Sequence, residues 1–223
     1  MTQFYTLAVH PTNPNYIKGG TQDNATPHTF GNIASWGNPG AGDGAGCAIN
    51  PFNTNFQYNS SQYHGLSKTT NGYASKSGFK PNFGSDRVPF IGKMWLDPNN
   101  GRYLYVNTDY LWRYDEDTDT WSARIGGVQH AGGSSRINAM DIAVGDSNRL
   151  VTGTGDGRVW LSTDFGANWT RIDRQGQSGG LPNRAITSVS INPTNHAEVL
   201  VGFSGSGDHL YRCTNVNAAS PNW

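Results

Sequence analysis

The chain has 223 residues, zero formal net charge and only 14% charged residues. A neutral chain without a basic surface is not expected to bind nucleic acid or an anionic membrane. No apolar run approaches the length of a membrane span, so membrane insertion is not expected either. Glycine is abundant, with 29 residues, and no segment keeps a helical periodicity. Short strands between Gly, Asn, Pro and Asp clusters predict an all-β protein.

A short apolar strand that ends in a small turn recurs along the chain, each time followed by a second strand. The turn positions 10, 50, 97, 145 and 192 are separated by 40, 47, 48 and 47 residues. The first strands are predicted at 7–9, 48–49, 95–96, 142–144 and 189–191, and the second strands at 16–20, 56–59, 103–106, 149–153 and 199–202. Four of the units predict a third strand, near 66–68, 111–113, 159–161 and 210–212.

Repeats of about 40–50 residues are typical of the blades of a β-propeller. Each blade is a small antiparallel sheet that buries its faces only against neighbouring blades. We therefore predict one propeller domain over 1–223. Its five units span approximately 1–40, 41–86, 87–134, 135–183 and 184–223. The repeat leaves open whether these units close into a five-bladed ring or form a fragment of a larger propeller.

The segment from Ser162 to Trp169 reads S-x-D-x-G-x-x-W. Asp164 can accept hydrogen bonds from the backbone of a tight turn, and Gly166 supplies a conformation that side chains resist. Trp169 can bury a large ring against the next hairpin. We predict that Ser162, Asp164, Gly166 and Trp169 form a structural turn and do not bind a ligand.

This segment resembles the Asp box, the repeated hairpin of BNR-type β-propellers found in sialidases, sortilin-like proteins, xyloglucanases and many secreted bacterial proteins. The N-terminal half resembles the secreted bacterial members, which carry a GGTQDNGT, W, GGDGG, DP series. The matching residues are 19–26, Trp36, 42–46 and 50–51, and they depart from the series at Ala25 and Ala41. The resemblance implies an extracellular location, a propeller fold, and modules that often belong to longer secreted chains.

The chain ends bear on that expectation. No signal peptide is visible, because the chain enters a strand directly after Met1. It stops at Trp223, where the closing strand of a blade would begin. We expect further blades or domains in a longer parent chain, closure of the last blade by the N-terminal strand, or self-association through the incomplete blade. Cys47 and Cys213 fall in units that are not neighbours in a five-bladed ring, so both are predicted to be free thiols.

Polar residues recur in the turns between second and third strands and in the loops between blades, which share one face of a propeller. Concave sites with a few convergent polar groups are default binding candidates. Asp and Gly also favour turns for purely structural reasons, so each Asp has a structural alternative. The candidate ligand-binding residues are Asp23, Asn24, Asp43, Tyr63, His64, Arg87, Asp109, Tyr110, Arg136, Asp156, Arg184, Asp208 and His209.

No metal site or cofactor is predicted. The Gly-Asp-Gly runs around Asp43 and Asp156 offer oxygen ligands of the kind Ca²⁺ prefers, but they lack the dense D-x-D-x-D spacing of a calcium loop. No residue is assigned a catalytic role, although Asp23, Asp109, Asp156 and Asp208 could in principle supply the carboxylate pair of a glycoside hydrolase.

Xyloglucanases and sialidases are the two classes of hydrolase that the chain partly resembles. The run from Tyr105 to Asp109 resembles the Y-x-x-T-D context of xyloglucanases, but aromatic residues replace the glycines that follow there. A sialidase needs a glutamate beside its nucleophilic tyrosine, and the chain has only Glu116 and Glu198, both predicted on the opposite face. The sequence therefore favours a non-catalytic extracellular module that binds glycans or a protein partner. A glycoside hydrolase, or a fragment of one, and a structural block of an extracellular assembly remain the alternatives.

Overall fold

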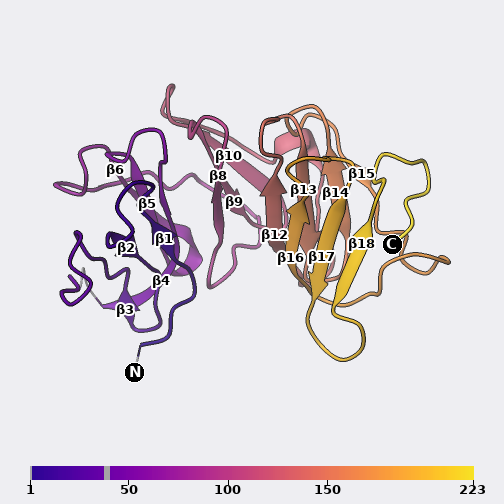
Figure 1. Ribbon diagram of the computed structural model, residues 1–223, viewed down its shortest axis with the longest axis horizontal. Helices are drawn as coiled ribbons and strands as arrows, with labels where there is room; N and C mark the ends of the chain where they lie inside the picture. The colour runs from indigo at the N-terminus through magenta and orange to yellow at the C-terminus, as the bar shows by residue number, and fades with distance from the viewer. Residues whose placement is uncertain (1, 38–40) are drawn as a thin grey trace. The chain divides into compact units, whose positions relative to one another are not determined.

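The computed structural model describes residues 2–37 and 41–223, and nearly all of its regular structure is β-strand (Figure 1). Within these residues the helical elements are the short 3₁₀ turns η1 (Gln62–His64) and η2 (Ile125–Gly127). No helix of the described residues is long and apolar enough to cross a membrane. The prediction of an all-β protein built from several antiparallel sheets is confirmed.

The chain divides into two compact units. The first holds residues 1–96 and 100–106, and the second holds 97–99 and 107–223. The predicted single domain and the five blade boundaries remain predictions. The described strands form five separate sheets, and the two alternatives of a closed five-bladed ring and a fragment of a larger propeller both remain predictions.

The first unit contains two sheets. One pairs β1 (Ala8–Val9) with β2 (Ile17–Lys18). The other has the order β3-β4-β5-β6-β7. Its strands are β3 (Asn24–Ala25), β4 (Gly42–Ile49), β5 (Gln57–Ser61), β6 (Gly65–Thr69) and β7 (Ser77–Gly78). The β3–β4 pair is parallel and the others are antiparallel.

The glycines of β4 explain how β3 pairs with it. A Cβ on Gly44 would lie 1.9 Å from the Ala25 carbonyl oxygen, and a Cβ on Gly20 would lie 1.8 Å from the Ala45 carbonyl oxygen. Neither approach is possible for a residue with a side chain, so these glycines let backbone segments pack directly on one another. The sequence had placed Asp43 in a loop between blades. That placement is wrong, because the close backbone approach extends β4 back to Gly42.

A further sheet has the order β11-β10-β9-β8. Its strands are β8 (Met94–Leu96), β9 (Tyr103–Asn107), β10 (Leu111–Asp115) and β11 (Thr120–Ser122). β8 and Tyr103–Val106 of β9 belong to the first unit, and β10 and β11 belong to the second.

The second unit adds two antiparallel sheets, with the orders β12-β13-β14-β15 and β16-β17-β18. Their strands are β12 (Ile137–Ile142), β13 (Leu150–Thr154), β14 (Val159–Ser162), β15 (Thr170–Arg171), β16 (Ile186–Ile191), β17 (Val199–Phe203) and β18 (Leu210–Cys213). Figure 1 shows their long strands running alongside each other. Buried side chains from both sheets, among them Val151, Ile186 and Val201, form one hydrophobic core.

The sheets of the second unit repeat one irregularity. The register of β12 with β13 shifts between Ile137 and Ala139, and the register of β16 with β17 shifts between Ile186 and Ser188. The β4–β5 pair of the first unit shifts in its first strand as well, between Gly44 and Cys47. Bulges of this kind are features that related units keep, so the shared shift supports an internal repeat.

The two cysteines are both free thiols, as predicted, and both are buried. Burial raises the pKa of the Cys47 thiol, while a hydrogen bond with the Thr6 hydroxyl lowers it by a smaller amount. Cys47 therefore behaves as a small core residue.

Candidate functional site

Asp23, Asn24 and Asp43 lie together in the first unit. The parallel pairing of β3 with β4 sets Ala25 opposite Asp43. The backbone N–H of Asp23 donates to Asp43 Oδ1 at 2.7 Å, and the Asn24 side chain donates to the Gln22 carbonyl oxygen at 3.2 Å. Burial, and then the charges of Asp43 and Asp23, raise the pKa of the nearby Tyr5. The structure thus brings Asp23 and Asn24 together with Asp43, which lies 20 residues after Asp23 in the sequence.

Asp43 also lines a pocket of about 160 Å³, which we call the β5–β6 pocket. This volume is roughly ten times what one water molecule needs and is below the size typical of drug-sized ligands. It suits one small polar unit, such as a single sugar ring. The lining residues are Ala25, Thr26, Ala41, Asp43, Gly44, Asn59, Ser60, Ser61, Gly65, Ser67, Tyr73 and Lys76.

The wall of the β5–β6 pocket holds one incompletely bonded amide. Asn59 Nδ2 donates to the Tyr73 hydroxyl at 2.9 Å, while Asn59 Oδ1 is buried without a hydrogen-bond partner among the described residues. Turning the amide over would only exchange which of its two atoms lacks a partner. Buried polar groups are nearly always satisfied in folded proteins, so Asn59 Oδ1 can accept a hydrogen bond from a donor, water or ligand, that enters the pocket.

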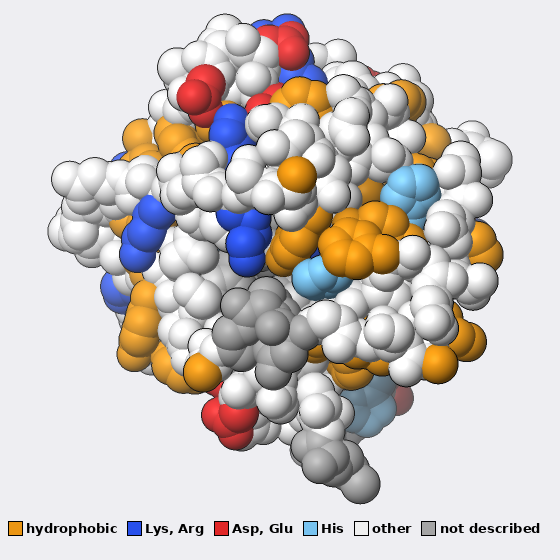
Figure 2. All heavy atoms as spheres, turned by 90° about the vertical axis from the view of Figure 1, so that its left-hand side faces the viewer, with side chains coloured by type: hydrophobic (Ala, Val, Ile, Leu, Met, Phe, Trp, Pro, Cys, Tyr) orange, Lys and Arg blue, Asp and Glu red, His pale blue; other side chains and the backbone are white. Residues whose placement is uncertain are grey.

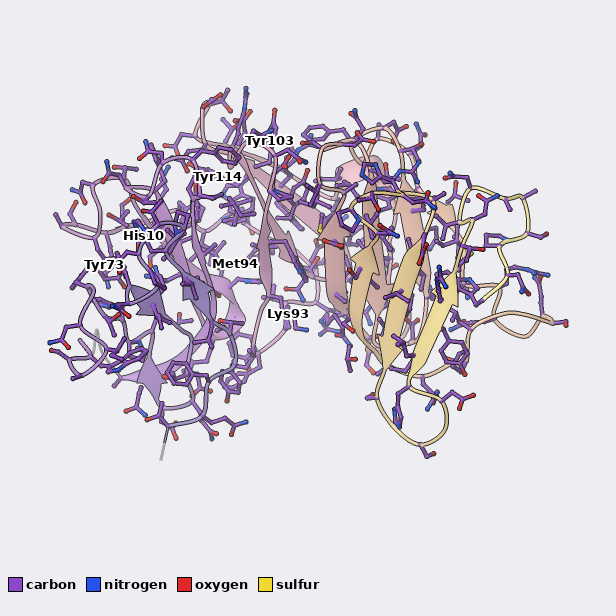
Figure 3. All side chains as sticks on the ribbon, viewed as in Figure 1. His10, Tyr73, Lys93, Met94, Tyr103 and Tyr114 are labelled. Atoms are coloured by element: carbon purple, nitrogen blue, oxygen red, sulfur yellow. The ribbon has the colours of Figure 1, made fainter. Side chains whose placement is uncertain are left out.

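Tyr73, which is labelled in Figure 3, lines the pocket and also contacts a group of aromatic and cationic side chains. Its ring centroid lies 4.5 Å from that of His28 and 6.3 Å from that of the exposed Phe30. Two ammonium groups approach the same ring, Lys76 Nζ at 5.1 Å and Lys18 Nζ at 4.8 Å from the centroid. Cations are attracted to the face of an aromatic ring.

Lys18 is the most unusual of these cations because it is fully buried. Its ammonium group contacts Gln57 Oε1 at 3.4 Å and forms no ion pair with any residue that the structure describes. Burial lowers the pKa of Lys18 to about 7. The predicted strand 16–20 includes Lys18, but nothing in the sequence predicts its burial or its lowered pKa.

The remaining candidates of the first unit lie elsewhere. Tyr63 and His64 form part of η1 and both have a positive φ. Tyr63 is 56% exposed and packs edge-on against Phe90, whereas His64 is fully buried beside Phe83. A ring that solvent does not reach cannot contact a ligand in this conformation. Arg87 is half-buried and does not line the β5–β6 pocket.

In the second unit, Asp109 and Tyr110 lie in the turn between β9 and β10. Asp109 is buried, and its Oδ2 accepts a hydrogen bond from Gln129 at 2.9 Å. The Tyr110 ring is covered by the Arg124 guanidinium, 4.6 Å from its centroid. Both candidates are therefore engaged in local structure.

Asp156 lies in the turn between β13 and β14. Asp156 Oδ2 accepts from the backbone N–H of Gly132 at 2.9 Å and forms an ion pair with Arg158 at 3.1 Å. The Arg136 guanidinium donates to the Ser134 and Ser135 carbonyl oxygens. These contacts tie Asp156 and Arg136 to neighbouring loops.

Arg184, Asp208 and His209 come together at the turn between β17 and β18. The Arg184 guanidinium donates to the carbonyl oxygens of Ser206 and Asp208. His209 Nδ1 lies 3.2 Å from the Phe203 carbonyl oxygen. The Asp208 and His209 side chains are exposed, and neither lines the β5–β6 pocket.

The S-x-D-x-G-x-x-W segment forms the turn between β14 and β15. Ser162 Oγ donates to Asp164 Oδ1 at 2.9 Å and accepts from the Gly166 N–H at 2.9 Å. Asp164 Oδ1 also accepts from the Asn168 N–H at 2.8 Å. The hydrogen bonds from Asn168 and Ser162 lower the pKa of Asp164. All of these bonds close the turn on itself.

Trp169 and the neighbouring β12–β13 turn complete this region. The Phe165 N–H donates to the Asn148 carbonyl oxygen at 2.9 Å, so the β14–β15 turn lies beside the β12–β13 turn. The Trp169 ring packs edge-on against His130, with 4.5 Å between centroids.

Among the described residues, no group of three or more His, Cys, Asp or Glu side chains is arranged to hold a metal ion. Asp43 is the only predicted candidate that lines the pocket, and the lining residues without a sequence prediction include Asn59, Ser67, Tyr73 and Lys76. A signal exists only for Asn59. β5 reads Gln-Tyr-Asn-Ser-Ser and is buried over its first four residues, although most of those are polar.

No protein-family model and no curated protein matches the chain. Solved structures do match. The GH74 enzyme of Niastella koreensis is similar over 97% of this chain, with a TM-score of 0.73 and 19% sequence identity. The extracellular domain of a hybrid two-component system from B. thetaiotaomicron is similar over 90% of the chain, with a TM-score of 0.65 and 15% identity.

These likenesses define a β-propeller-like all-β fold. The chain spans 37% of the length of the GH74 chain and 26% of the length of the two-component system chain.

Proposed function

We propose that this chain is an extracellular recognition module of β-propeller type that binds glycans through the β5–β6 pocket. The observation that carries the proposal is the chemistry of that pocket. Its wall combines a carboxylate, an amide with an unmet acceptor, serine hydroxyls, a tyrosine ring and a lysine. Sugar hydroxyls both donate and accept hydrogen bonds, and pockets for small ligands use a few convergent polar groups of this kind.

The extracellular location and the propeller of BNR/Asp-box blades belong to the proposal. The similarity to an extracellular domain favours the location. Two observations favour BNR/Asp-box blades: the register shift that three sheets share, and the turn at Ser162, which is closed by hydrogen bonds between its own residues. A protein partner in place of a glycan would need a broader surface than a pocket of about 160 Å³.

A blocking substitution tests the glycan site. Ser67 is half-buried in the pocket wall, and Ser67→Trp fills the pocket with an indole ring. Ser122→Trp on the exposed part of β11 is the matched control. We expect a panel of soluble polysaccharides, assayed by affinity electrophoresis, to contain a ligand that retards the wild type and Ser122→Trp but not Ser67→Trp. Equal retardation of all three proteins would refute the site.

The second candidate function is glycoside hydrolysis, favoured by one observation. Asp23 and Asp43 are brought together, and the similar Niastella koreensis protein is a GH74 enzyme. Hydrolysis needs two carboxylates that flank the scissile bond. Incubation of each bound polysaccharide with the wild type and with Asp43→Asn, followed by a reducing-sugar assay, tests it. Release by the wild type alone would establish a hydrolase, and no release by either would leave binding as the function.

A further inference from the structure

The net charge of the chain is zero because its two units carry opposite formal charges of equal size. The first unit contains all five lysines and two arginines against three aspartates, a formal side-chain charge of +4. The second contains nine arginines against eleven aspartates and two glutamates, a formal side-chain charge of −4. The first unit has no glutamate at all. Figure 2 shows blue Lys and Arg side chains beside hydrophobic and histidine side chains on a face of this unit.

The β5–β6 pocket carries part of this charge. Lys76 lines the pocket, is exposed, and forms no ion pair with a described residue. Its ammonium group lies only over the Tyr73 ring, at 5.1 Å from the centroid, so an anion can replace that weak contact. Lys18 lies beside the same ring but is fully buried and does not line the pocket, so Lys76 is the cation that a ligand can reach.

The pocket also holds one carboxylate, that of Asp43. Asp43 is only 7% exposed, and its Oδ1 accepts the Asp23 N–H. A carboxylate bonded in this way can still accept a hydrogen bond from a sugar hydroxyl with its other oxygen. The Lys76 ammonium group can form an ion pair with an acidic group of the ligand at the rim of the pocket. The exposed Phe30 ring, 6.3 Å from the Tyr73 ring centroid, extends the site with an apolar surface on which a further sugar ring can lie.

We infer that the β5–β6 pocket binds an anionic glycan, whose carboxylate or sulfate group pairs with Lys76 while its hydroxyls meet Asp43 and Asn59. The inference rests on the proposed function and names its ligand class. A neutral glycan would leave the cation of the pocket without a partner.

Isothermal titration with the unlabelled protein tests this inference. The probes are an oligogalacturonate, a chondroitin-sulfate oligosaccharide and a neutral xyloglucan oligosaccharide. We expect at least one acidic probe to bind and the neutral probe to bind at least tenfold more weakly. Because hydrogen bonds to a charged group are the stronger ones, Lys76→Gln should weaken acidic-probe binding about tenfold, and Lys76→Arg should retain it.

Lys80→Gln is the matched control. It removes the same charge from an exposed position of the same unit that does not line the pocket, and we expect less than a twofold effect. An equal loss in Lys76→Gln and Lys80→Gln would overturn the direct contact. Tight binding of the neutral probe with none of the acidic ones would overturn the inference while leaving the glycan site intact. If neither these probes nor any polysaccharide of the panel bound, both the inference and the proposed function would be refuted. Binding of one acidic probe alone would support the inference and identify the acidic group.

Discussion

Ser162 organises its turn with a single hydroxyl group. The hydroxyl is buried, donates to Asp164 and accepts from the Gly166 N–H at 2.9 Å. Gly166 has a φ of 84°, so the turn needs this glycine as well as the hydroxyl. Because nothing else satisfies the Gly166 N–H within the turn, the serine contributes to the stability of the turn.

Replacing Ser162 by alanine is therefore expected to lower the free energy of unfolding by about 1–2 kcal/mol, the cost of leaving a buried donor unpaired. Urea unfolding followed by tryptophan fluorescence measures the change. Thr163→Ala, which removes an exposed hydroxyl from the next position, should have no measurable effect. A loss in Thr163→Ala as large as that in Ser162→Ala would show that the hydrogen bonds of Ser162 are not the cause.

His130 is a second residue whose environment decides its behaviour. It is fully buried, with Nδ1 at 2.9 Å from the Thr152 hydroxyl and its ring against Trp160 and Trp169. Burial lowers the pKa of His130 to about 3, against an ordinary value of 6.5. The unfolded chain binds a proton at this position below about pH 6.5, and the folded chain does so only near pH 3.

Stability should consequently fall as the pH drops from 6.5 towards 3, with up to about 1.4 kcal/mol lost per pH unit through this residue. His130→Asn keeps a polar group near Thr152 but cannot titrate, so its unfolding free energy should fall less steeply over that range. The exposed His209→Asn should follow the wild type. Parallel curves for the wild type and His130→Asn would contradict the prediction.

At the scale of elements, Gly153 on β13 determines how closely β16 packs against that strand. A Cβ at this position would lie 2.5 Å from Ile186 Cγ2 and 3.0 Å from Val189 Cγ1. Ile186 is fully buried in the shared core. The absence of a side chain at Gly153 is therefore a packing requirement between the two sheets.

Gly153→Ala should overpack this contact and cost about 1–3 kcal/mol. Ile186→Ala should cost about 2–5 kcal/mol through the cavity it leaves. Since the added methyl group occupies part of that cavity, the double variant should lose less than the sum of the two losses. Chemical unfolding of the four proteins measures the coupling, and strict additivity would show that the two residues do not share this contact.

The sequence predicts the strands of the second unit closely. The predicted 149–153 and 199–202 correspond to β13 (Leu150–Thr154) and β17 (Val199–Phe203), because both strands are apolar runs bounded by turn residues. The Gly-rich start of β4 was missed, since glycine weakens any strand signal and only the packing of Ala25 on Gly44 explains the pairing.

The pocket was harder to predict than the strands. Asp43 was a candidate, but Asn59, Ser67, Tyr73 and Lys76 come from strands and loops whose residues are ordinary for a solvated surface. Their function depends on convergence, which arises from pairing between β5 and β6 and from the path of the chain after β6. No local pattern encodes that convergence.

For the whole molecule, the opposite charges of the two units predict how binding responds to salt. The Debye length shrinks from about 30 Å at 0.01 M to about 3 Å at 1 M. We expect the affinity for an acidic oligosaccharide to fall steadily over this range, and the dependence to be shallower in Lys76→Gln. A salt-independent affinity, measured by the same titration, would contradict a contribution from the charge of the first unit.

The distribution of lysine has a practical consequence for any assay of this protein. Because the second unit contains no lysine, reagents that modify amines will attach a dye, biotin or sensor surface only to the first unit, with the exposed Lys76 among the targets. Attachment at Lys76 would obstruct the pocket whose binding the assay is meant to measure. A negative result from an amine-coupled sensor or a biotinylated probe would then reflect the chemistry of attachment.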